Sequence, residues 1–396
     1  MAASFRSGRH RLILIGMSRN HRLSFYEFFA GGGMARLGLG EAWTCAFAND
    51  FDPVKARTYR DNFADAAEHF VEGDVWKLEP SDLPGQADLA WASSPCQDFS
   101  LAGARAGLKG GRSSAFFGFW KLMEALVAEG RAPRTIVVEN VVGLFTSHGG
   151  ADFTALCRAL ASQGYRFGAL EIDAAAFLPQ SRPRVFVIAT REAVPEALQG
   201  DSPFQTRAVR EAHDRLPADL AAGWIWWRGE APLRRNAQLA DLLDPDAGAD
   251  WHPPQKTAEL LALMSPLHRA RIEQLRAAGG RAAGGLFRRM RVENGVKVQR
   301  AEVRFDGLAG CLRTPRGGSS RQTLVVVDEG KVRTRLISGR EGARLMGLPE
   351  TYRLPKAATS ALHVCGDGVA VPAVRWLAET LLEPLLAADQ RADAAA

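Results

Sequence analysis

Short apolar runs alternate with helical patterns along the first 190 residues of the chain. Runs typical of strands are LSFYEFF, WTCAFAN, ADLAWA, RTIVVEN and RVFVIAT. Helical spacing is found over 33–42, 52–62, 114–129 and 151–163. This alternation predicts an α/β fold with a mainly parallel sheet covered on both faces. Ligands of such sheets bind beyond the carboxyl ends of the strands, so the residues that follow each strand are candidates for function.

The alternation stops near residue 191 and gives way to an irregular stretch rich in Pro, Trp and Arg. A regular pattern resumes at about 336 and ends in an amphipathic helical pattern. We therefore expect a catalytic domain made of 22–193 and 336–388, with a smaller domain over 194–335. Residues 1–21 are expected to form a basic leader outside the fold, and 389–396 a frayed tail.

Two features of the middle stretch, 194–335, bear on its role. Trp224, Trp226 and Trp227 are expected to form the core of the smaller domain rather than a stacking surface. The basic run RRMR at 288–291 is either a solvated face or a set of phosphate contacts.

Composition narrows the class of protein only slightly. The chain has 396 residues, and its 50 Lys+Arg against 44 Asp+Glu give a net charge of +6, which permits a polyanionic partner without requiring one. Its five cysteines form no C-x-x-C pair, which disfavours disulfides and zinc and fits a reduced, cytoplasmic compartment. The apolar run LILIG at 12–16 is too short to span a bilayer.

A glycine-rich turn follows the first expected strand, Asp50 ends the second, and Asp74 follows a third expected strand that ends at EGD, ahead of ADLAWA. Gly31 and Gly33 allow a tight turn and a close ligand, although the third glycine of a full G-x-G-x-x-G is missing. Asp50 can bond both ribose hydroxyls of a nucleoside, and Phe51 can pack on an adenine. Asp74 can accept from the adenine amino group; the alternative for either carboxylate is a helix cap. No P-loop is present, which favours a nucleoside cofactor with few or no phosphates.

A second group of residues indicates covalent catalysis. Cys96 stands directly after Pro95 in SSPCQDFS, just past a strand, where neighbouring cations could deprotonate a nucleophilic thiol. Glu139 ends a neighbouring strand. Arg182 and Arg184 precede the next one and, being alternate residues, share a face. The alternative is a core cysteine beside a structural salt bridge.

Taken in order, these motifs resemble those of the DNA (cytosine-5)-methyltransferase family. The motifs are FAGGG, ND with YRDNF, EGD, PCQDFS, ENV, QSRPR, LRTPRGGSS, REGARLMGLP and GDGVAVPAV. The resemblance covers about 22–193 and 300–385. It implies a Rossmann-like methyltransferase domain that uses S-adenosylmethionine, together with a smaller target-recognition domain.

The resemblance also implies roles for individual residues. Cys96 would attack C6 of a flipped-out cytosine in duplex DNA, Glu139 would sit at cytosine N3, and Gln97 would follow the nucleophile in a loop that closes over the base. Arg182 and Arg184 would support the active site. The donor site would be lined by Phe29, Gly31, Gly33, Asp50, Phe51, Asp74, Val75, Pro95, Asp367 and Val369. No metal is expected.

The implied partner is double-stranded DNA, bound by a monomer, and a companion restriction endonuclease is compatible with the family. No membrane association is expected, and the implied location is the cytoplasm, at the nucleoid. A tRNA methyltransferase of the same family and an inactive DNA-binding relative are the alternatives. An amino-methyltransferase is disfavoured, because Cys96 stands where its motif has a second proline.

Two residues depart from the family pattern. Met34 replaces a usual glycine, and Asp367 replaces a usual asparagine near the amino-acid end of the donor. We expect Asp367 to contact the donor's ammonium group, since an ionised carboxylate can only accept hydrogen bonds. The alternative is a donor whose charge differs at that end.

Overall fold

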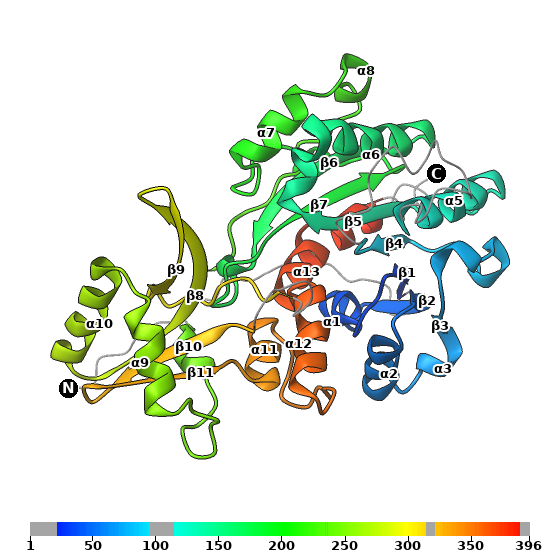
Figure 1. Ribbon diagram of the computed structural model, residues 1–396. Helices are drawn as coiled ribbons and strands as arrows, with labels where there is room; N and C mark the ends of the chain where they lie inside the picture. Colours follow the sequence, from blue (N-terminus) through cyan, green and yellow to red (C-terminus); the bar gives the residue numbers. More distant parts are fainter. Residues whose placement is uncertain (1–21, 95–114, 234, 236, 314–320, 389–396) are drawn as a thin grey trace, which may run out of the picture.

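The computed structural model describes residues 22–94, 115–233, 235, 237–313 and 321–388 in two lobes (Figure 1). The larger lobe contains a seven-stranded sheet of order β3-β2-β1-β4-β5-β7-β6. Its strands are β1 (Leu23–Phe28), β2 (Trp43–Asp50), β3 (Phe70–Glu72), β4 (Leu89–Ala92), β5 (Thr135–Val141), β6 (Arg166–Asp173) and β7 (Pro183–Thr190). Strands β1 to β5 pair in parallel, and β7 runs antiparallel to both β5 and β6. The predicted α/β class with a mainly parallel sheet is confirmed.

Helices cover both faces of this sheet, because its central strands are apolar on both sides. In β1, Phe25 faces a core shared with α1 (Met34–Leu39) and α13 (Val371–Leu377). The next residue, Tyr26, faces a second core shared with α5 (Ala115–Ala128) and α6 (Ala151–Ser162). The helix α2 (Pro53–Asn62) starts directly after β2, where the Asp52 side chain accepts from two backbone amides of its first turn. All four helices predicted in this part of the chain are present, whereas β6 was missed.

The three tryptophans expected in the smaller domain belong to the larger lobe instead. Trp224 packs at the outer edge strand β6, where the backbone of Phe167 bonds to the neighbouring residues 223 and 225. Trp227 is buried, and its indole Nε1 donates to the carbonyl of Ile188 in β7 at 3.3 Å. The expectation was wrong because an exposed edge strand needs cover, and this segment supplies it.

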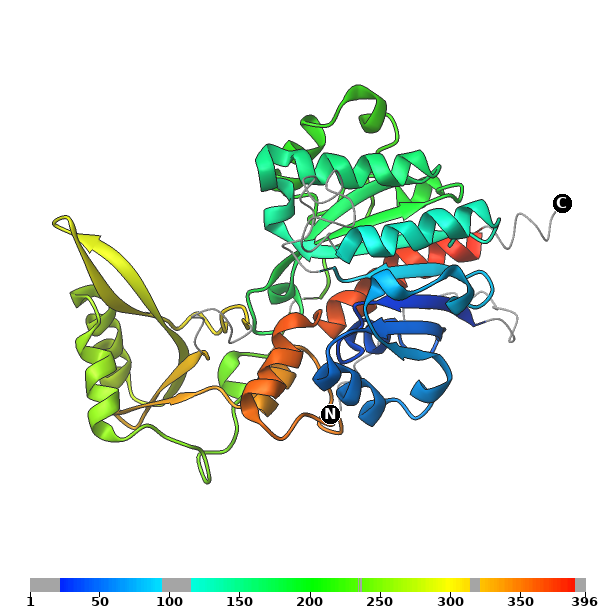
Figure 2. The same ribbon diagram turned by 45° about the vertical axis from the view of Figure 1, so that its right-hand side comes forward.

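The smaller lobe is an antiparallel sheet of order β11-β10-β8-β9, backed by two helices (Figure 2). Its elements are α9 (Pro254–Ala262), α10 (Pro266–Ala278), β8 (Arg281–Glu293), β9 (Val296–Arg304), β10 (Thr323–Asp328) and β11 (Lys331–Leu336). Strand β10 pairs with β8 only as far as Leu286, so residues 287–293 pair with β9 alone. The result is a two-stranded ribbon that projects from the lobe and ends in an Asn294–Gly295 turn, both with positive φ.

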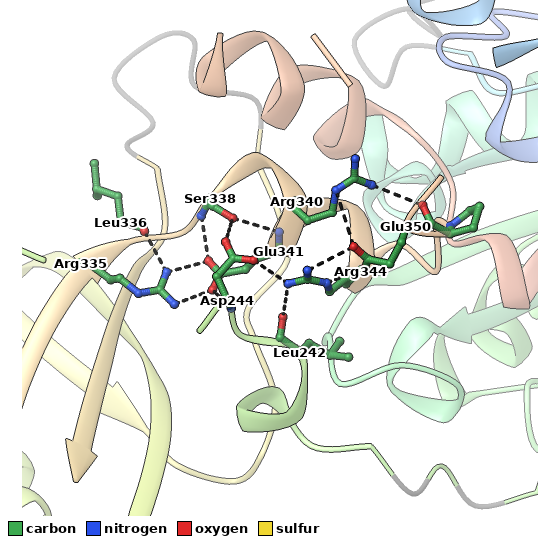
Figure 3. Close-up of polar contacts among 10 residues, drawn as sticks. Leu242, Asp244, Arg335, Leu336, Ser338, Arg340, Glu341, Arg344 and Glu350 are labelled. Carbon is green, nitrogen blue, oxygen red and sulfur yellow. Dashed lines mark hydrogen bonds and ion pairs between the residues drawn. The ribbon is translucent and has the colours of Figure 1, made fainter. Parts of the chain in front are cut away.

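A polar network joins the smaller sheet to the larger lobe (Figure 3). At the end of β11, Arg335 forms a buried ion pair with Glu341 of α11 (Gly339–Leu345), at 2.5 Å. Ser338 caps α11 by accepting from the amide of Glu341 and donates to Asp244 at 2.6 Å. Arg344 of the same helix binds the other oxygen of Asp244 at 2.7 Å. These bonds hold three separate segments together and so fix the orientation of the smaller sheet relative to the larger lobe.

Candidate active site

Glu139 and Arg184 form a charged pair at one edge of the large sheet. Arg184 starts the antiparallel strand β7 opposite the end of β5, which brings its Nε to 3.2 Å from Glu139 Oε1. The Glu139 side chain is almost fully buried. Burial raises the pKa of Glu139, and Arg184, Arg182 and a hydrogen bond with Ser93 oppose this. The net pKa is raised, so this carboxyl holds a proton more readily than an exposed one.

Arg182 makes backbone contacts that Arg184 does not make. Its guanidinium is buried and donates to the carbonyl oxygens of Leu312 at 3.1 Å, Gly366 at 2.7 Å and Gly368 at 2.6 Å. Burial and the neighbouring Arg184 lower its pKa to about 10. The guanidinium therefore ties two distant segments of chain to the start of β7, whereas Arg184 is the arginine that meets Glu139.

The segment that leads to the predicted nucleophile begins beside Glu139. Cys96, Pro95 and Gln97 lie outside the described residues. Ser94 comes directly before them, and Asn140 of β5 donates to its carbonyl at 3.1 Å and to its hydroxyl at 3.3 Å. The chain is thus anchored next to the Glu139–Arg184 pair just before Pro95. Asn140 had no predicted role of its own, although its place directly after Glu139 in the ENV motif was the available signal.

The predicted nucleoside site lies at the ends of β1 and β2. The amide of Gly31 donates to Asp50 Oδ2, and the amide of Asp52 donates to Asp50 Oδ1, both at 2.8 Å. A carboxylate has about four acceptor positions, so these amides orient Asp50 and leave room for ribose hydroxyls. A Cβ at Gly31 would meet no atom within 4 Å, and the Phe51 side chain is 67% exposed. The residues fit a nucleoside.

The other predicted donor residues divide by environment. Gly33 lies in the left-handed region, where any side chain would collide with the ring of Phe63. Asp74 caps a short turn by accepting from the amide of Trp76, which is the alternative role considered for it. Phe29 follows β1 and has a positive φ, and Val75 and Val369 are both buried.

Two contacts in this region were not predicted. Asp367, the last residue of α12 (Ala358–Asp367), forms an ion pair with Lys55 of α2, whose Nζ lies 2.8 Å from its Oδ2. Cys311 lies between the two arginines, with its Sγ 3.3 Å from Arg182 Nη1 and 4.0 Å from Arg184 Nη2. Both contacts join residues far apart in the sequence, and no local pattern marks them.

The mainly parallel sheet, with an oriented carboxylate at the end of β2 and a carboxyl of raised pKa near the end of β5, fits a Rossmann-like methyltransferase of the α/β class. The family model described as C-5 cytosine-specific DNA methylase matches residues 23–383. The chain belongs to this family and is a DNA cytosine-5 methyltransferase, as predicted. The match does not favour the tRNA alternative.

Curated relatives and solved structures agree with this assignment. The Type II methyltransferase M.BsuFI of Bacillus subtilis is 26% identical over 94% of this chain and 76% of its own length. The Type II methyltransferase M.HhaI of Haemophilus parahaemolyticus is 24% identical over 90% of this chain and 93% of its own. The S. pombe Dnmt2 methyltransferase superposes with a TM-score of 0.59 at 16% identity, over 92% of this chain and 99% of its own, which supports the fold.

The described residues show neither a metal-binding cluster nor a membrane-spanning helix. They contain no group of three or more His, Cys, Asp or Glu side chains placed to hold a metal ion. Among the same residues, no helix combines the length and apolar character needed to cross a bilayer.

Proposed function

We propose that this enzyme methylates C5 of a cytosine flipped out of duplex DNA, through a covalent bond between Cys96 and cytosine C6. S-adenosylmethionine, held at Asp50, Phe51 and the 29–33 turn, supplies the methyl group when bound. The observation that carries the proposal is the buried Glu139–Arg184 pair, which lies beside the segment leading to Cys96.

Each residue of the pair has a distinct task. The Cys96 thiolate adds to C6, and negative charge builds on the pyrimidine ring. Glu139 in its protonated form donates a hydrogen bond to cytosine N3. The Arg184 guanidinium offsets the negative charge that develops on cytosine O2. With charge held there, C5 becomes the nucleophilic end of an enamine and takes the methyl group. The proton at C5 then leaves, and expulsion of the thiolate restores Cys96.

We propose that Arg182 holds the Glu139–Arg184 pair in position and does not contact the base. Its three bonds to backbone carbonyls fix 312 and 366–368 against the start of β7, next to Arg184. A fixed β7 keeps Arg184 on Glu139. We therefore assign Arg182 as a positioning residue and Arg184 as the catalytic arginine.

We assign DNA reading to the smaller lobe, and we place its start nearer 230 than 194, since 223–227 packs on the large sheet. The projecting β8–β9 ribbon has the width of an element that enters a major groove. Leu286, Ala301 and Val303 lie on its helix-covered face, in the core with α9 and α10. Phe287 lies on the other face, close to Gly310.

The face that bears Phe287 is turned toward the active site. Gly310 is adjacent to Cys311, which contacts Arg182. Cross-strand pairing places Arg289 opposite Arg300 on this face, whereas Arg288 lies opposite the buried Ala301 on the helix-covered face. We therefore propose that Arg289 and Arg300 meet the DNA and that Arg288 does not.

The curated relatives bear on a possible partner protein of this enzyme. Several curated relatives are named Type II methyltransferases, which supports a companion restriction endonuclease for this chain. We also propose that the enzyme acts as a monomer on DNA.

The test of the function is methyl transfer from labelled S-adenosylmethionine to duplex DNA, with tRNA as the competing substrate. We expect DNA to be labelled at cytosine C5 and tRNA to remain unlabelled. Glu139→Gln should lower the rate of transfer without abolishing DNA binding. Labelling of tRNA alone, or of an exocyclic nitrogen, would overturn the proposal.

A further inference from the structure

Lys55 is a partly buried cation that the reaction described above does not use. It lies in the first turn of α2, where its side chain is 17% exposed and its Nζ is 2.8 Å from Asp367 Oδ2. Burial lowers the pKa of Lys55, but Asp50 and Asp367 outweigh this effect and leave the pKa raised. The side chain therefore stays protonated, between the carboxylate predicted to hold the ribose and the residue that departs from the family pattern.

The segment around Asp367 contacts both Arg182, next to the catalytic pair, and Lys55, near the predicted donor site. On one side, Arg182 holds the carbonyls of Gly366 and Gly368, which flank Asp367. On the other side, Asp367 meets Lys55. This short segment therefore links the region around Asp50 and Lys55 to the arginine that adjoins the catalytic pair.

The second departure from the family pattern touches the same segment. A Cβ placed on Gly368 would lie 2.2 Å from the sulfur of Met34. Met34 therefore packs directly against Gly368, next to Asp367. The two unusual residues therefore meet at one short segment, 367–368.

We propose that Lys55 and Asp367 together bind the zwitterionic amino-acid end of the donor, with Lys55 taking its carboxylate and Asp367 its ammonium group. This inference rests on the proposed function, since it assumes a donor of the S-adenosylmethionine type. A lone aspartate would repel the donor carboxylate. The adjacent lysine removes that repulsion, and the pair offers one charge of each sign to a ligand end that carries one of each.

The competing explanation is a structural brace between α2 and α12. The two explanations differ for ligands that lack the amino-acid end. Calorimetric titration of the full chain with S-adenosylhomocysteine and with 5′-methylthioadenosine separates them, since only the first ligand carries that end. Arg60→Met is the matched control. Arg60 lies on α2, as Lys55 does, and it forms an ion pair with Glu72 of β3.

We expect Lys55→Met and Asp367→Asn each to weaken S-adenosylhomocysteine binding by about tenfold to 100-fold, the range for a charged hydrogen bond. Binding of 5′-methylthioadenosine should be unchanged, and Arg60→Met should change neither ligand. On the unaltered protein, converting the carboxylate of S-adenosylhomocysteine to an amide should cost at least about tenfold. This last measurement needs no variant to fold.

Three outcomes would overturn the inference: equal weakening of both ligands, no loss with the amide ligand, or tighter binding of S-adenosylhomocysteine by Asp367→Asn. If the unaltered protein bound neither ligand, the donor assignment itself would fall. That result is distinguishable from failure of the charge pair alone, in which both ligands still bind.

Discussion

Replacing Arg182 with methionine should loosen residues 312 and 366–368, which its guanidinium ties to the start of β7. Methionine keeps an unbranched apolar stem but leaves the carbonyls of Leu312, Gly366 and Gly368 without this donor. Hydrogen bonds to a charged group contribute about 1.5–3 kcal/mol each. The substitution also removes the cost of keeping a charge at this position. Burial and Arg184 together lower the pKa of Arg182 to about 10, which corresponds to roughly 3 kcal/mol. The expected net loss of local stability is about 2–5 kcal/mol, similar to the loss when one member of a buried ionic network is removed.

Amide hydrogen exchange followed by mass spectrometry measures this loss locally. A loss of about 3 kcal/mol corresponds to roughly 100-fold faster exchange in the peptides that contain 312 and 366–368. Arg184→Met is the matched control, since Arg184 pairs with Glu139 and makes none of these carbonyl bonds. We expect it to leave exchange at 366–368 unchanged while lowering methyl transfer by about 100-fold or more. Unaltered exchange in Arg182→Met, or equal loosening in Arg184→Met, would refute the division of roles.

Three further predictions concern acidity and DNA contact. Burial raises the pKa of Glu139 and Arg184 opposes this, so transfer that needs the protonated carboxyl should fall as pH rises through that pKa. Arg184→Met should move the fall to higher pH in single-turnover profiles; a fall at lower pH would contradict the assignment. Burial also raises the pKa of Glu27 from 4.5 to about 8, so its contribution to stability is full below 4.5 and is lost as pH rises through 8. In urea titrations Glu27→Gln should remove this dependence, and a dependence that persisted would implicate another group. Finally, Arg289→Ala should flatten the salt dependence of DNA affinity by a slope of about 0.9, whereas Arg288→Ala should not; the reverse result would mean that DNA meets the helix-covered face.

The position of the active site could be predicted from the sequence because parallel strands carry their ligands at one edge. Asp50, Glu139 and Arg184 each adjoin a strand end, and the structure brings Glu139 and Arg184 together. Pattern could not distinguish Arg182 from Arg184. Both follow the same alternation, but Arg184 meets Glu139, whereas the carbonyl partners of Arg182 come from 312 and 366–368, which the fold alone brings near.

The errors and omissions have physical causes. Aromatic composition marks Trp224 and Trp227 as buried but does not say in which lobe, and the open edge of β6 decided the matter. Lys55 was overlooked because its partner Asp367 lies at the other end of the chain. The Asn294–Gly295 pair, a sequence signal for a tight hairpin turn, was also overlooked; in the structure it forms the end of the ribbon.

The central claim is that Cys96 bonds covalently to cytosine C6 during methyl transfer. DNA carrying 5-fluorocytosine at the target tests it most directly, because fluorine cannot leave C5 as a proton does and the adduct therefore persists. We predict a donor-dependent complex of enzyme and DNA that survives denaturation and is visible by mass spectrometry. Cys96→Ala should form no such complex and should transfer no methyl group, while still binding DNA. Methylation of cytosine C5 by the alanine variant would contradict the account.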